Sequence, residues 1–116
     1  MGVKSHVLIV SSDYTFASIL ERELGPEYDV HSASTDLAAF ALLDSYSYVC
    51  MVVDLSARSV AGSATVSSLR LNALTIPIVA LVPAGVETVL PERALAVIGD
   101  HDPIPRLAAA VKQATA

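Results

Sequence analysis

The chain has 116 residues, of which 53% are hydrophobic and 16% charged, and its formal net charge is −5. This length fits a single domain over residues 1–116, and the hydrophobic share excludes an intrinsically disordered chain. The seven basic residues form no run, so we expect no direct binding to nucleic acid or to an anionic membrane.

Targeting features are also missing from the sequence. The longest stretch without charge, Leu71–Val86, is too short for a bilayer span and is broken by proline. The first residues lack a small-residue cleavage site, so we expect no signal peptide. The single cysteine, Cys50, lies in an apolar run, where we expect a buried, inert thiol. These features favour a cytoplasmic protein.

The first third of the chain predicts two strands and two helices in alternation. Val7–Val10 reads as a strand, and Asp13, after two serines, suits the N-cap of a helix that ends at Gly25-Pro26. Helical spacing predicts that four residues of this helix face inward: Phe16, Ile19, Leu20 and Leu24. Tyr28–Ser32 reads as the second strand. A second helix follows, capped by Ser34, Thr35 or Asp36, with apolar Leu37, Phe40, Ala41 and Leu43 and a polar break near Asp44.

The rest of the chain continues this alternation. Tyr48–Val53 is apolar on both faces, as a central parallel strand requires, and it ends in Asp54. A loop containing Gly62 leads to a helix over Ser63–Leu74, and Ile78–Val82 reads as the fourth strand. The remaining expectations are a short helix beginning at Pro91, a fifth strand over Ala96–Ile98, and a last helix capped at Asp102-Pro103 with Leu107, Ala110, Val111 and Ala114 on one face.

Five strands alternating with helices predict a doubly wound α/β fold with helices on both faces of the sheet. In such sheets, ligands and chemistry gather at the carboxyl ends of the strands. The residues to inspect are therefore those that follow the predicted strands, above all Ser11 to Asp13 and Asp54.

Two segments carry a resemblance to a known family. Val52-Val53-Asp54-Leu55, followed by Gly62 eight residues after the aspartate, resembles the phosphoacceptor strand of bacterial two-component receiver domains. Ile76-Pro77-Ile78-Val79-Ala80-Leu81 is similar to that family's fourth strand, and the resemblance spans the whole chain. It implies a flavodoxin-like (CheY-like) fold with strand order 2-1-3-4-5, and it implies that Asp54 occupies the position of the phosphorylated aspartate.

The sequence departs from the family at the residues that support phosphoryl transfer. The family's acidic pair at the end of the first strand corresponds to Ser11 and Ser12, which are poor ligands for a hard cation. Asp13 and Asp54 are the only candidates for holding Mg²⁺, and both are weak. Capping the first helix is the more natural role for Asp13. The family's hydroxyl position is Val82, and its lysine position falls at or near Asp102.

Signalling residues differ as well. The only lysines of the chain are Lys4 and Lys112, so no alignment with the family would place a lysine just before the last helix. All six aromatic residues lie at or before Tyr48, so the family's aromatic switch on the fifth strand cannot exist here. The loss of one preorganised donor typically costs about a hundredfold to a thousandfold in rate.

These departures predict an atypical receiver, or pseudo-receiver, that works by protein contact without aspartyl phosphorylation. Its expected partners are a histidine kinase, an output domain or a downstream regulator, or a second copy of the chain. We expect no enzymatic activity and no cofactor. A conventional receiver phosphorylated on Asp54 with Mg²⁺ is the first alternative, and a flavodoxin-like ligand binder or enzyme is a more remote one.

Simpler roles remain open for several polar residues. Asp54 can be structural, with its carboxylate accepting hydrogen bonds from Ser11 or Ser12. His6, His31 and His101 are scattered without ligand spacing, so we expect ordinary polar roles for them and no metal site. No glycine-flanked nucleophile or phosphate-cradling loop is present, which argues against catalysis and nucleotide binding.

Overall fold

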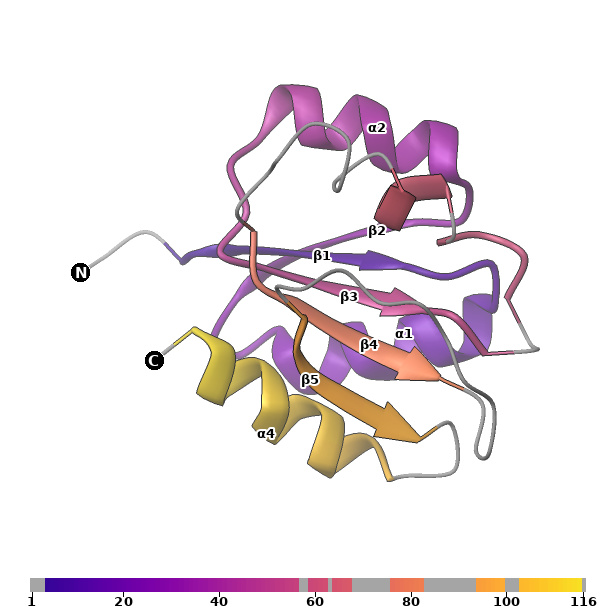
Figure 1. The fold of residues 1–116 in the computed structure, drawn as a ribbon. Helices are drawn as coiled ribbons and strands as arrows, with labels where there is room; N and C mark the ends of the chain where they lie inside the picture. The colour runs from indigo at the N-terminus through magenta and orange to yellow at the C-terminus, as the bar shows by residue number, and fades with distance from the viewer. Residues whose placement is uncertain are drawn as a thin grey trace.

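The computed structural model describes residues 4–56, 59–62, 64–67, 76–82, 94–99 and 103–115, with only the backbone considered for 94–99. Its centre is a five-stranded, all-parallel sheet in the order β2-β1-β3-β4-β5 (Figure 1). The strands are β1 (His6–Val10), β2 (Asp29–Ala33), β3 (Cys50–Asp54), β4 (Ile78–Val82) and β5 (Ala94–Gly99). The helices are α1 (Tyr14–Leu24), α2 (Asp36–Ser45) and α4 (Ile104–Ala114). The predicted fold class and strand order are confirmed.

The strands alternate their side chains between two apolar layers, which is why the central ones read as unbroken hydrophobic runs. Val7 and Val52 face α1 and α4, whereas Leu8 and Val53 face the layer that α2 covers (Figure 1). β3 is the clearest case, because all five of its residues are buried. Helices on both faces therefore leave neither face of this strand exposed to water.

Helix α1 begins as its sequence predicts. The Asp13 carboxylate accepts a hydrogen bond from the backbone N–H of Phe16 at 3.2 Å, which is the N-cap arrangement. Phe16, Leu20 and Leu24 are buried as expected. Ile19 was predicted to face inward, but it is 48% exposed, and Ala17 occupies the inward position instead.

Helix α2 buries fewer of its side chains than its apolar composition would predict. Thr35 is the N-cap, with its hydroxyl accepting from the N–H of Ala38 at 3.1 Å. Leu37 and Ala41 are exposed, and Ala39 is the buried residue of this helix. Because seven of its ten residues are apolar, the sequence of this helix marks no single preferred face, and the packing against β1 and β2 selects Ala39.

The C-terminal helix α4 packs beside α1 through Leu107 and Val111, as its spacing predicts. Its N-cap is Pro103, which offers no side-chain cap, so the expectation that Asp102 caps this helix is wrong. Asp102 itself lies outside the described residues, as does most of the predicted Ser63–Leu74 helix, of which 64–67 are helical. The predicted helix at Pro91 also lies outside them. The fifth strand is longer than Ala96–Ile98.

Within the part of the chain that the structure describes, none of the helices is both long and apolar enough to cross a membrane.

Candidate functional site

The strand register brings Ser11 and Asp54 together. Val10 pairs with Val53 across β1 and β3, so the next residue of each strand lies at the carboxyl edge of the sheet. Both side chains are buried there, with Ser11 2% exposed and Asp54 fully covered. The Ser11 hydroxyl donates to Oδ2 of Asp54 at 2.8 Å. Ser11 therefore makes the hydrogen bond to Asp54 that was predicted for Ser11 or Ser12.

The second carboxylate oxygen of Asp54 is also engaged. Oδ1 accepts from the backbone N–H of Ser56 at 3.0 Å and from the Ser56 hydroxyl at 2.5 Å. Ser56 is itself buried. A buried carboxylate is costly unless donors replace the water that it loses, and these bonds supply such donors to both oxygens. Ser56 had no role in the sequence analysis, although its hydroxyl and its position two residues after Asp54 are typical of such a local bond.

Ser12 bonds to the loop after β3 and not to Asp54. Its backbone N–H donates to the Ser59 hydroxyl at 2.9 Å, and its own hydroxyl accepts from the N–H of Val60 at 2.8 Å. Ser12 thus ties the end of β1 to the loop that follows β3. The alternative that Ser12 is the partner of Asp54 is wrong.

Asp13 is half-buried and engaged in local structure. Its Oδ1 caps α1, and its backbone N–H donates to the Ser11 hydroxyl at 3.1 Å. Ser11 therefore accepts from Asp13 and donates to Asp54, which links the start of α1 to the end of β3.

The loop after β3 is held against α2 by one carboxylate. Oδ1 of Asp36 accepts from the backbone N–H groups of Gly62 and Thr65, each at 2.9 Å, and from the Thr65 hydroxyl. Gly62 has a φ of +115°, a conformation that side chains rarely adopt. The glycine that the resemblance singled out is therefore required by backbone geometry and close packing beside Asp54.

The remaining candidate positions offer no donor within the described residues. Val82 ends β4 at the same edge and packs against the apolar layer under α2, where its side chain has nothing to donate to a phosphoryl oxygen. Asp102, placed at the family's lysine position, lies outside the described residues. The loss of the family's hydroxyl at Val82 and of its lysine at or near Asp102 therefore rests on the sequence alone.

The residues around Asp54 do not fit a magnesium site. Mg²⁺ demands near-octahedral oxygen ligation and is usually held by one or two carboxylates with open positions for water. Here Ser11 occupies one carboxylate oxygen of Asp54, Ser56 occupies the other, and Asp13 caps a helix. Among the described residues, no group of three histidine, cysteine or acidic side chains gathers at this edge.

Replacing Ser11 by aspartate tests the conclusion that the residues around Asp54 do not fit a magnesium site. We expect Ser11→Asp to lower the melting temperature in the absence of divalent cations, because it places a second buried carboxylate beside Asp54. Added Mg²⁺ should then raise the melting temperature of Ser11→Asp by several degrees more than that of the unmodified chain, since a cation relieves this repulsion. Thermal unfolding monitored by circular dichroism, with Ser12→Asp as the control at a half-exposed position, measures the difference. Equal responses to Mg²⁺ in the unmodified chain and Ser11→Asp would contradict the assignment.

Large apolar side chains stand exposed around the same edge. Tyr14, at the start of α1, is 83% exposed, and Val60, in the loop bonded to Ser12, is 92% exposed. Leu37, next to the Asp36 that anchors this loop, is 78% exposed. The edge of the sheet that holds Asp54 is thus flanked by apolar groups, as a protein-contact surface often is.

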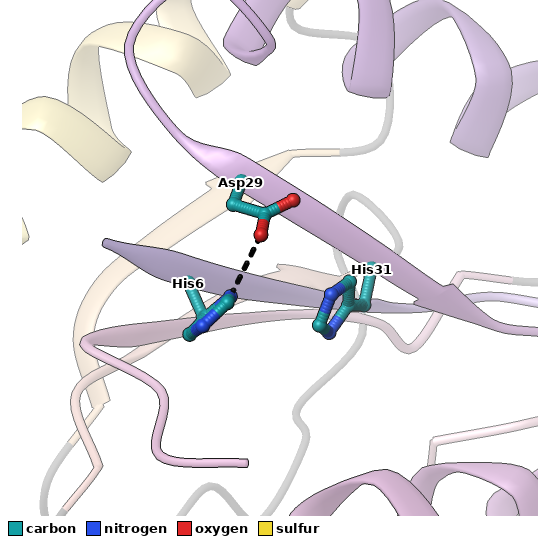
Figure 2. Close-up of side chains that lie close together, drawn as sticks. All are labelled: His6, Asp29 and His31. Atoms are coloured by element: carbon teal, nitrogen blue, oxygen red, sulfur yellow. Dashed lines mark ion pairs between the residues drawn. The ribbon is translucent and has the colours of Figure 1, made fainter. Parts of the chain in front are cut away.

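The structure also assembles a cluster that the sequence analysis missed. His6, Asp29 and His31 meet at the opposite edge of the sheet, where the strands begin (Figure 2). The histidines are far apart along the chain, so their sequence spacing gives no sign of this cluster. Parallel pairing of β1 with β2 joins residues that are 23 positions apart, and no sequence motif signals it.

The strand order, the helices on both faces and the aspartate that ends β3 define the fold of response regulator receiver domains. Comparison with solved structures confirms this fold. The receiver domain of the Francisella response regulator 1452 matches with a TM-score of 0.79 at 17% sequence identity, covering 96% of this chain and 96% of that one. The CheY-like receiver domain from Methanospirillum hungatei JF-1 matches with a TM-score of 0.78 at 17% identity, covering 96% and 93%.

A structure described as an adenylate cyclase from Rhodopirellula baltica is similar too, with a TM-score of 0.81, 17% identity, and coverage of 97% and 88%. No sequence-family model matches the chain, and no curated protein matches it in sequence. At these identities the likeness establishes the CheY-like fold, and the activity has to be argued from the residues.

Proposed function

We propose that the chain is an atypical receiver domain, a signalling module that works by protein contact and does not depend on phosphorylation of Asp54. One observation carries the proposal: Asp54 is fully buried, and both of its carboxylate oxygens accept hydrogen bonds from Ser11 and Ser56. An acceptor carboxylate must present an oxygen to the incoming phosphorus. Here that oxygen would first have to lose its donors and become exposed.

The surrounding groups support the same proposal. Phosphoryl transfer between anionic groups needs a cation and preorganised donors to stabilise the charge that spreads over the transferred oxygens. Ser11 stands where a carboxylate ligand would be needed, and Val82 stands where a hydroxyl would be needed. We therefore propose no Mg²⁺ requirement and no enzymatic activity for this domain.

Protein contact is the remaining way in which such a domain can signal. The exposed apolar side chains of Tyr14, Leu37 and Val60 flank the Asp54 edge and offer a surface for a protein partner. A kinase, an output domain, a downstream regulator or a second copy of the chain would use such a surface. Burial raises the pKa of the Cys50 thiol to about 12, which makes it unreactive. Because the chain has only this one cysteine and so no disulfide of its own, we propose a cytoplasmic location.

Incubation with Mg²⁺ and acetyl phosphate, followed by intact mass measurement, tests the proposal. We expect no stable mass gain, because the carboxylate is enclosed and the site lacks metal ligands. A receiver domain of known phosphorylation, treated in the same way, verifies that the donor is active. A mass gain of one phosphoryl group that disappears in Asp54→Asn would establish the conventional receiver instead.

A further inference from the structure

The cluster of His6, Asp29 and His31 is created by the strand register at the amino end of the sheet. His6 pairs with Asp29, and Leu8 pairs with His31, across β1 and β2. Since side chains alternate between faces, these pairings place both histidines and the aspartate on the same face of two adjacent strands. Asp54 is the last residue of its strand, so the cluster and the Asp54 site lie at opposite edges of a parallel sheet.

The geometry between His6 and Asp29 is that of two ligands. Nδ1 of His6 lies 3.2 Å from Oδ2 of Asp29, yet this buried nitrogen makes no hydrogen bond within the described part of the chain. A tetrahedral ion with bonds of about 2.0–2.1 Å holds its ligand atoms about 3.3 Å apart. One candidate ligand atom from each of the three side chains lies within 4.8 Å of the other two (Figure 2). Small side-chain rotations would bring all three to bonding distance.

The second histidine is held as metal-bound histidines usually are. Nδ1 of His31 lies 2.8 Å from the hydroxyl of Tyr48, which leaves Nε2 as the nitrogen for a metal. When Nδ1 carries the proton, it donates to the Tyr48 oxygen and the lone pair of Nε2 is free.

Neighbouring rings limit how far the imidazoles can turn. Tyr46 lies against both, with ring centroids 4.6 Å from His31 and 5.4 Å from His6. The cluster still has access to solvent, because the side chains of His6 and Asp29 are 27% and 55% exposed. An ion can therefore enter from outside, and water can complete its coordination.

From this arrangement we propose that His6, Asp29 and His31 bind one divalent transition-metal ion of the zinc class, with water as the fourth ligand. Two imidazole nitrogens and one carboxylate oxygen suit Zn²⁺ and its neighbours, whereas Mg²⁺ prefers an all-oxygen set. The bound ion would join the edge strand β2 to β1. The metal-site proposal does not depend on the proposed function, which concerns the other end of the sheet.

Isothermal titration of the full chain with Zn²⁺ tests the proposal, at slightly alkaline pH because imidazole must be unprotonated to bind metal. We expect one ion per chain. His6→Phe, His31→Phe and Asp29→Asn should each lower the affinity by at least about tenfold, because even the loss of a partner behind a ligand costs that much. Tyr48→Phe should weaken binding by about tenfold, because Tyr48 is the hydrogen-bonding partner behind His31. Absorption of bound Co²⁺ would report a tetrahedral site.

Controls separate this site from weaker binding elsewhere. His101→Phe removes the third histidine and Glu23→Gln removes an exposed carboxylate on α1, and both should bind Zn²⁺ as the unmodified chain does. Asp54→Asn should also keep Zn²⁺ binding, so the two sites are tested apart. Circular dichroism verifies folding, and His6→Gln and His31→Gln replace any phenylalanine variant that fails to fold. No Zn²⁺ binding by the unmodified chain, or equal affinity in the three ligand variants, would overturn the proposal and leave the cluster as ring packing.

Discussion

Asp54→Ala is expected to lower the free energy of unfolding by about 2–4 kcal/mol, because it leaves buried donors without an acceptor. The Ser11 hydroxyl and both donors of Ser56 lose the carboxylate that they now contact. Removing the carboxylate also ends its own desolvation cost, which offsets part of the loss. Several donors face this one group, so the loss should exceed the gain. Urea denaturation of both proteins gives the difference.

The sign of this change distinguishes the two kinds of receiver. In a pocket of clustered carboxylates, removal of one negative charge relieves repulsion and stabilises the fold. In the present site Asp54 is surrounded by hydroxyl and amide donors, so removal should destabilise it. Asp44→Ala is the control, because Asp44 is an exposed aspartate on α2. An increase in stability for Asp54→Ala would mean that the hydrogen bonds described here do not hold the carboxylate.

Gly62→Ala should destabilise the fold by about 2–4 kcal/mol, from a strained backbone and from overpacking. The φ of +115° disfavours any side chain. A Cβ at this position would lie 2.9 Å from Cγ1 of Val53 and 3.2 Å from the carbonyl oxygen of Asp54. The loop would have to move away from the end of β3, which would loosen the groups around Asp54. Thermal unfolding of the variant measures the effect.

Gly25→Ala is the matched control for this substitution. Gly25 ends α1 with a φ of −55°, which is ordinary for alanine. Its added methyl group would approach the Glu21 carbonyl oxygen at 3.1 Å. We expect a change of less than about 1 kcal/mol. If Gly62→Ala were as mild as Gly25→Ala, the tight packing of this loop on β3 would be disproved.

The hydrophobic pattern predicts much of the fold. β4 has the predicted bounds, and the Asp13 cap of α1 is confirmed. These features follow from strand length, apolar runs and capping chemistry, all of which are local. Ile19, which the spacing predicted to face inward, is exposed, because Ala17 of the same helix is buried instead. Which residue of an apolar helix packs on the sheet depends on the neighbouring element.

The candidate site divides in the same way. No acidic residue precedes Asp13 and no lysine lies between Lys4 and Lys112, and the sequence alone determines both facts. It cannot determine whether Ser11 or Ser12 bonds to Asp54, because the two are adjacent and chemically identical. The register of β1 against β3 decides for Ser11, and Ser12 bonds to the loop after β3 instead.

The sequence by itself thus determined the alternation of strands and helices, the single aspartate at the end of the third strand, and the shortage of charged partners around it. Only the tertiary structure decided that Asp54 is enclosed by Ser11 and Ser56, and that His6, Asp29 and His31 meet at the far edge. The physical reason is the parallel sheet itself. Its register places side by side residues that lie far apart along the chain, and local patterns carry no record of that pairing.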